Sequence, residues 1–84
     1  MTKLLVTLNI PTIDSHFDVY LPINKKIGTI KKYLITTIKE LTDGNFNIDL
    51  DKIKMIDQET GKEYENNTYL IDSGIKNGSQ IIIF

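Results

Sequence analysis

Hydrophobic and polar residues alternate along residues 3–10, and this period of two predicts a half-buried β-strand. The apolar residues on one face of that strand are Leu4, Val6, Leu8 and Ile10. After a polar turn at residues 11–15, the same alternation continues over residues 17–21, and Pro22 ends it. We expect the two strands to pair antiparallel as a hairpin.

The hydrophobic period then changes from two residues to that of an α-helix. Apolar residues recur at steps of three and four residues, at Ile30, Leu34, Ile38 and Leu41. This pattern predicts one amphipathic helix that packs on the sheet through its apolar face. Thr29 is the expected N-cap, and Asp43-Gly44 is the expected stop, because Gly44 can adopt the left-handed conformation.

The second half of the chain carries weaker strand signals and one strong one. Residues 53–56 predict a short strand, and residues 63–64, beyond a turn that contains Gly61, predict its hairpin partner. Asn77-Gly78 is a turn signal, and the continuously apolar residues 81–84 predict a central strand. This order of elements predicts an α+β fold with a mixed four- to five-stranded sheet packed on one amphipathic helix.

Length and composition limit what this fold can do. The 84 residues suffice for one compact domain and are too few for two, so we expect a single domain spanning residues 1–84. With 40% hydrophobic and 25% charged residues, the chain is typical of globular proteins. No apolar run is long enough for a signal peptide or a membrane span. We therefore expect a cytoplasmic protein without direct membrane insertion.

The charged residues argue against nucleic acid as a partner. The net charge is −1, but residues 1–42 carry six lysines against three acidic residues, and residues 43–84 carry four against eight. All ten basic residues are lysines, whereas phosphate groups are usually bound by the bidentate guanidinium of arginine. We expect no nucleic-acid partner.

Catalytic chemistry has no basis in the sequence. The chain contains no cysteine, and its one histidine, His16, follows Asp14 and Ser15 directly, so these side chains cannot converge as a triad. There is also no glycine-rich phosphate loop, no metal-ligand cluster and no pair of carboxylates at helical spacing. We expect no catalytic residue, no metal and no cofactor, and conclude that the chain is not an enzyme.

The closing pattern Leu70-x-Asp72-x-x-Ile75-x-x-Gly78-x-x-Ile81-x-Ile83 resembles the run that precedes the last strand of ubiquitin-like domains. Together with the hairpins and the helix, the resemblance covers essentially the whole chain and implies a ubiquitin-like β-grasp fold. Within that superfamily, residues 70–78 and the chain length are similar to the bacterial EsaB/YukD family. Fifteen isoleucines, seven asparagines and no arginine are also typical of AT-rich bacterial genomes.

The resemblance implies a function that the residues alone do not give. The EsaB/YukD family is associated with type VII secretion, as a cytoplasmic accessory or regulatory component, so the implied partner is a cytoplasmic domain of the membrane secretion machinery. Ubiquitin-like modifiers and sulfur carriers need a flexible Gly-Gly tail, whereas this chain stops at Ile83-Phe84, in or at the end of a predicted strand. We therefore expect docking to a protein partner and not conjugation.

Strand alternation separates core residues from candidate binding residues. It directs Ile53, Met55, Ile81 and Ile83 toward the helix. It directs the candidate protein-binding residues, Leu5, Ile56, Ile82 and Phe84, to the opposite face. Of these, Ile56, Ile82 and Phe84 match the position of the exposed apolar patch on the sheet of ubiquitin, and contiguous exposed apolar surface is typical of interaction sites. The alternatives are that a loop covers the patch or that these are scattered surface residues.

A second candidate surface is basic. Its residues are Lys25, Lys26, Lys31 and Lys32, around the start of the predicted helix. They would suit an acidic partner or an anionic membrane surface, although such a helix start often simply faces water. Two hypotheses of function follow: a non-catalytic adaptor or regulatory protein, and a self-associating structural module that forms a homodimer through the sheet face. The first predicts a monomer at micromolar concentration, and the second a homodimer.

Overall fold

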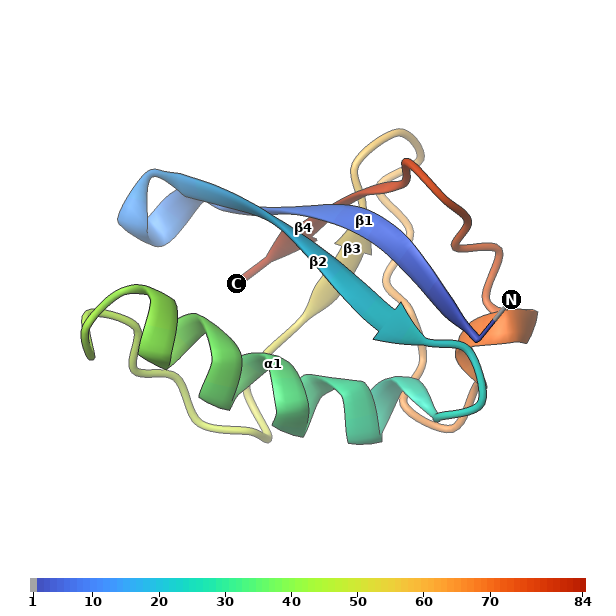
Figure 1. Cartoon of the computed structure of the whole chain (residues 1–84), viewed down its shortest axis with the longest axis horizontal. Helices are drawn as coiled ribbons and strands as arrows, with labels where there is room; N and C mark the ends of the chain where they lie inside the picture. The colour runs from blue at the N-terminus through green and yellow to red at the C-terminus, as the bar shows by residue number, and fades with distance from the viewer. Residues whose placement is uncertain (1) are drawn as a thin grey trace.

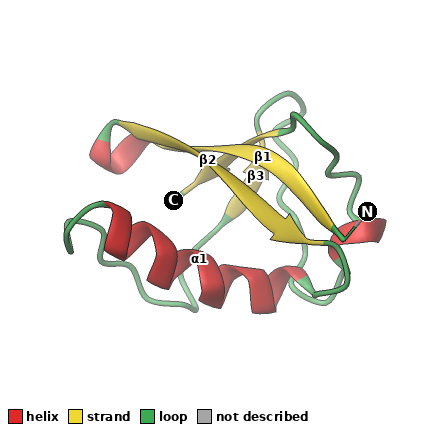
Figure 2. Cartoon of the chain, in the orientation of Figure 1, coloured by secondary structure: helices red, strands yellow, loops and turns green. Residues whose placement is uncertain are grey.

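The computed structural model describes residues 2–84, so of the predicted domain only Met1 lies outside the described residues. A four-stranded sheet packs on one helix (Figures 1 and 2). The elements are β1 (Lys3–Ile10), η1 (Pro11–Ile13), β2 (Ser15–Pro22), α1 (Ile27–Leu41), β3 (Met55–Asp57), η2 (Leu70–Asp72) and β4 (Gln80–Ile83). This arrangement confirms the predicted α+β architecture, with the lower of the two expected strand numbers.

The sheet is mixed, with the strand order β2-β1-β4-β3. β1 pairs antiparallel with β2 and parallel with β4, and β3 pairs antiparallel with β4. The predicted hairpin is therefore confirmed, and β4 is central, as its continuously apolar sequence predicts. In Figure 1 the sheet forms the upper layer and α1 runs beneath it.

The start of α1 differs from the prediction. The helix begins at Ile27, so Thr29 lies inside its first turn, and the N-cap is Lys26, which makes no side-chain cap hydrogen bond. The first N–H groups are bound instead by a distant loop: Ile27 donates to the carbonyl oxygen of Thr68 at 2.9 Å, and Gly28 donates to that of Asn66 at 3.0 Å. Tertiary contacts satisfy the donors that a capping side chain would otherwise bind.

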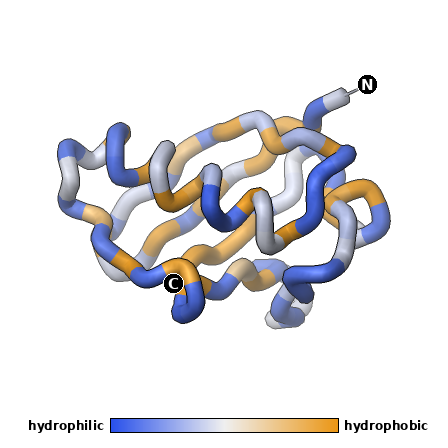
Figure 3. The backbone as a smooth tube through the Cα atoms, turned by 90° about the horizontal axis from the view of Figure 1, so that it is seen from below, coloured by the Kyte–Doolittle hydropathy of each residue, from blue (hydrophilic) through white to orange (hydrophobic). Residues whose placement is uncertain are grey.

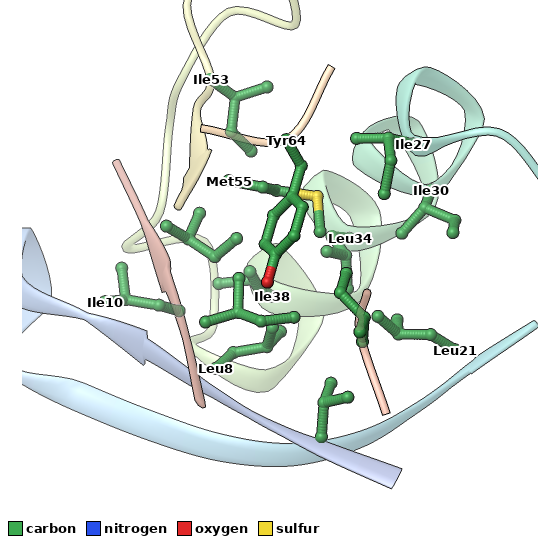
Figure 4. Packing of buried hydrophobic residues seen from close by; sticks show 14 of the residues in the cluster. Leu8, Ile10, Leu21, Ile27, Ile30, Leu34, Ile38, Ile53, Met55 and Tyr64 are labelled. Carbon is green, nitrogen blue, oxygen red and sulfur yellow. The ribbon is translucent and has the colours of Figure 1, made fainter. Parts of the chain in front are cut away.

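The predicted strand at residues 63–64 is wrong. The structure has only an isolated bridge between Ile56 and Glu63, flanked by hydrogen bonds from Tyr64 N–H to the Met55 carbonyl (2.9 Å) and from Asp57 N–H to the Lys62 carbonyl (2.8 Å). The chain then leaves the sheet, and Tyr64 directs its ring into the core, where only 6% of the residue stays exposed (Figure 4). One bridging pair is too short to extend the ladder.

The core lies between the sheet and α1. Every strand and helix contributes buried hydrophobic residues except η1, and β3 contributes Met55 alone. Ile53, Met55, Ile81 and Ile83 are all buried, which confirms their predicted direction toward the helix. Figure 3 views the molecule from the helix side and shows polar and apolar positions interspersed along α1. The buried helix residues include Ile30, Leu34 and Ile38 from the predicted stripe. Within residues 2–84, no helix has the length and apolar character needed to cross a membrane.

Candidate protein-docking site

The face of the sheet turned away from α1, called the outer face below, follows directly from the strand register. It carries the odd-numbered residues of β1 and the even-numbered residues of β2, β3 and β4, because side chains alternate between the two faces of a strand. In this register Ile56 lies opposite Ile82, and Asn9 is the neighbour of Ile82 on the other side.

Three of the four candidate binding residues lie together at one end of the outer face. Phe84 follows Ile82 by two residues and stays beside residue 54, since the Lys54 N–H donates to the Phe84 carbonyl (2.6 Å) and the Phe84 N–H donates to the Lys54 carbonyl (3.2 Å). Phe84 is 42% exposed, whereas Ile56 and Ile82 are half-buried and belong to no part of the core cluster. We call Ile56, Ile82 and Phe84 the apolar trio.

A band of polar side chains separates the trio from Leu5. The Thr7 hydroxyl donates to Asp18 Oδ1 at 2.7 Å, and the side-chain amide of Asn9 donates to Gln80 Oε1 at 3.2 Å and also to the side chain of Gln58. Thr7, Asp18 and Gln80 occupy the row of the outer face between the two ends, and Asn9 borders that row beside Ile82. The fourth candidate is therefore not contiguous with the trio.

Leu5 instead forms a second apolar spot with an aromatic residue that the sequence analysis did not select. It lies opposite Tyr20 in the β1–β2 register, and the two residues are 39% and 60% exposed. The sequence contained a signal for this separation, because Thr7, Asn9 and Asp18 are polar residues at outward positions of the same alternating pattern. The candidate surface therefore consists of two apolar spots rather than one.

The basic candidate surface loses one of its four lysines. Lys31 is only 4% exposed, and its Nζ donates to Asn66 Oδ1 at 2.7 Å. Burial lowers the pKa of Lys31 from its usual value of 10.5, and the nearby carboxylate of Glu63 partly offsets that effect. Lys31 lies on the same side of the helix as the buried Ile27 and Leu34, four residues before it and three after it, so its stem packs inward and its ammonium is almost inaccessible to a partner.

The other three lysines remain on the surface. Lys25, Lys26 and Lys32 are exposed, and the Lys26 ammonium lies 5.6 Å from the centroid of the Tyr69 ring, within range of a cation–π interaction. An open hollow beside the start of α1 is lined by Lys26 and Lys32 but also by Asp51, so its charge is mixed. Within residues 2–84, no group of three His, Asp or Glu side chains is placed to hold a metal ion.

Comparison with known proteins identifies the fold. The sequence matches no protein-family model and no curated protein. Among solved structures, the ubiquitin-like domain of the Arabidopsis thaliana protein At2g32350 is similar, with a TM-score of 0.74 and 19% identity over 100% of this chain and 78% of that chain. A chain of the ESX-5 inner membrane complex is similar with a TM-score of 0.80 and 11% identity, over 100% of this chain and 21% of that chain.

A third similar structure is that of ATBAG1 in complex with HSP70, with a TM-score of 0.70 and 18% identity over 96% of this chain and 39% of that chain. Identities this low establish the fold and not the family. The chain has the ubiquitin-like β-grasp fold.

Proposed function

We propose that this chain is a non-catalytic ubiquitin-like adaptor or regulatory protein that acts by docking to a protein partner and not by conjugation. The observation that carries the proposal is the apolar trio on the outer face. Ile56, Ile82 and Phe84 make no part of the core, so their apolar character is unexplained by the stability of the fold. Apolar side chains gathered on a surface and bordered by polar ones are typical of interaction sites.

The size of the trio suggests a moderate affinity. Full burial of an Ile or Phe side chain contributes about 1.5–3 kcal/mol, and less where the side chain is already half-buried, as Ile56 and Ile82 are. The three residues together then supply roughly half of the ~8 kcal/mol that corresponds to a micromolar dissociation constant. A partner must add contacts on the surrounding rim, where Lys54 is exposed.

The proposed partner is a cytoplasmic domain of a bacterial type VII secretion machinery, and we propose accordingly that this chain is cytoplasmic. Two observations support this choice: the similarity of residues 70–78 to the EsaB/YukD family, and the similarity of the fold to a chain of the ESX-5 inner membrane complex. The exposed Lys25, Lys26 and Lys32 provide a second, basic contact for acidic residues of such a partner.

The test is an affinity capture from detergent-solubilised bacterial membranes with the wild-type protein, Ile82→Glu and the matched control Gln80→Glu. Both substitutions introduce the same charge on the outer face of β4, but only the first lies in the trio. We expect secretion components to be retained by wild type and by Gln80→Glu and lost with Ile82→Glu, with the melting temperature of all three within a few degrees.

Other results would contradict the proposal. Retention of the same partners by Ile82→Glu would exclude the trio as the docking site. If no partner is retained while the wild-type protein is a dimer that Ile82→Glu dissociates, the chain is instead a self-associating module that pairs through the outer face. Leu5→Glu then tests whether the second apolar spot contributes, because the polar band separates it from the trio.

A further inference from the structure

The two edges of the sheet differ in how their backbone groups are covered. At the β3 edge, Tyr64 N–H donates to the Met55 carbonyl and Asp57 N–H donates to the Lys62 carbonyl, so residues 62–64 lie against that strand. At the other edge, β2 is the last strand in the order, and no other part of residues 2–84 pairs with its free side. β2 is also long, with eight residues.

The hydrogen bonds of the hairpin determine which groups of β2 face outward. Ile23 N–H donates to the Thr2 carbonyl at 3.1 Å, so this pair is a hydrogen-bonded pair of the antiparallel ladder. Hydrogen-bonded pairs alternate with non-bonded pairs, and the register makes Leu21, Val19 and Phe17 the next bonded residues of β2. The backbone N–H and C=O groups of the residues between them therefore point away from β1, to the open edge.

The other side of β1 agrees with this alternation. Its odd-numbered residues bond toward β4, as seen in the hydrogen bonds from Thr7 N–H to the Ser79 carbonyl (3.0 Å) and from Gly78 N–H to the Leu5 carbonyl (2.8 Å). The outward donors of β2 are therefore the N–H groups of His16, Asp18 and Tyr20. Pro22, which has no N–H, also occupies an outward position at the end of the strand.

We propose that β2 pairs antiparallel with β2 of a second copy of this chain, about a two-fold axis, so that the two four-stranded sheets become one continuous sheet. Natural edge strands are commonly protected by lysines, by prolines, by an inserted bulge or by a covering segment. Within the described residues, β2 has none of these before its last residue, Pro22: its register with β1 is unbroken over eight pairs, and Asp18 is its one formally charged residue.

The strand's own chemistry selects one symmetric register. All three outward N–H groups must find acceptors within residues 15–22 of the second copy. This is possible only when the two-fold axis passes through residue 18 or residue 19. An axis through residue 18 places the two Asp18 carboxylates directly opposite each other, which is destabilising. An axis through Val19 avoids that contact and places Asp18 opposite Tyr20 of the second copy.

In the register centred on Val19, every outward donor finds an acceptor. His16 donates to Pro22 of the second copy, and Asp18 and Tyr20 exchange hydrogen bonds across the axis. On the helix side of the sheet, Val19 meets Val19 of the second copy, and Phe17 meets Leu21. Phe17 and Val19 are only half-buried in the single chain, so this pairing covers apolar surface that the fold leaves partly exposed.

This inference replaces the monomer expected of an adaptor with a dimer, but it concerns a different surface from the proposed docking site, because the trio lies on β3 and β4, away from the β2 edge. Either proposal can therefore fail without the other. The first test compares the oligomeric state of wild type, Tyr20→Pro and Tyr20→Thr by sedimentation equilibrium, with circular dichroism to verify folding. Proline removes the outward N–H without affecting a bond to β1, whereas threonine removes the ring and keeps the donor. We expect a wild-type dimer, weakened about tenfold or more by Tyr20→Pro and far less by Tyr20→Thr.

Two results of this test would overturn the inference: a wild-type protein that stays monomeric up to millimolar concentration, or a dimer that Tyr20→Pro leaves unchanged. The register has its own test, since the chain contains no cysteine. Mild oxidation should link two Val19→Cys chains, whose new side chains face each other, and should leave Asp18→Cys unlinked. The opposite pattern would overturn the pairing about Val19.

Discussion

Replacement of Asn66 by alanine should destabilise the fold by about 2 kcal/mol, because it leaves the buried ammonium of Lys31 without its partner. Lys31 is 4% exposed and its Nζ lies 2.7 Å from Asn66 Oδ1. The backbone carbonyl of Asn66, which accepts a hydrogen bond from Gly28 N–H, is unaffected by the substitution. The change therefore isolates the side-chain hydrogen bond.

The magnitude follows from the charge and the burial of the donor. A hydrogen bond to a charged group contributes about 1.5–3 kcal/mol, and the short distance is typical of charge-assisted bonds. Water can replace the lost partner only in part, because Lys31 is almost inaccessible, while the attraction of Glu63 for the ammonium remains. A loss of about 2 kcal/mol corresponds to a fall in melting temperature of roughly 10 °C for a domain of this size.

The assay is urea unfolding of four proteins: wild type, Asn66→Ala, Lys31→Met and the double variant. Methionine keeps most of the apolar stem and removes the buried charge, so Lys31→Met alone should change the free energy of unfolding by less than about 1.5 kcal/mol. In the Lys31→Met background, Asn66→Ala should cost less than about 0.5 kcal/mol. An equal cost of Asn66→Ala in both backgrounds would refute the reasoning.

Three further predictions concern the core, the helix end and the alkaline limit of stability. Leu34→Ala should cost about 2–5 kcal/mol in urea unfolding, because Leu34 is fully buried, whereas Tyr33→Ala on the exposed side should cost under about 1 kcal/mol; equal losses would contradict the assigned helix face. Gly44→Ala should cost about 1 kcal/mol in thermal unfolding and Gly44→Asn less, because φ at Gly44 is +83°; equal melting temperatures for all three proteins would contradict this. Burial, and then Asp57, raise the pKa of Tyr64 from 10.0 to about 12, so the stability linked to its proton is complete below pH 10 and is lost as the pH rises to about 12. The free energy of unfolding of wild type relative to Tyr64→Phe should fall by about 2 kcal/mol across that interval, and a constant difference would disprove the linkage.

The sheet was predictable where a short-range period determines the outcome. Alternation in residues 3–10 identified the buried face of β1, since a strand between a helix and solvent must place every second side chain inward. The same rule directed Met55 and Ile81 toward α1. The central position of β4 followed from its continuously apolar sequence, because a central strand has neighbours on both sides.

The features that sequence reasoning missed depend on contacts between distant segments. The helix begins at Ile27 because residues 66 and 68 accept its first N–H groups, and nothing near Ile27 in the sequence signals those acceptors. Lys31 is buried for a related reason, since its partner is 35 positions away. To predict that Leu5 is separated from the trio, one needs the register of β1 against β4, and alternation within a single strand does not give that register.

The parallel pairing of β1 with β4 also sets the order in which the chain can acquire its structure during synthesis. The β1–β2 hairpin and α1 are complete by Leu41, but β1 has no second neighbour until Gln80–Ile83 have been made. Until then the hydrophobic core between β1 and α1 is incomplete, because it lacks Ile81 and Ile83 of β4. We therefore expect the nascent chain to close its core only after β4 has been made, and the closing of this long loop to carry a large share of the entropic cost of folding.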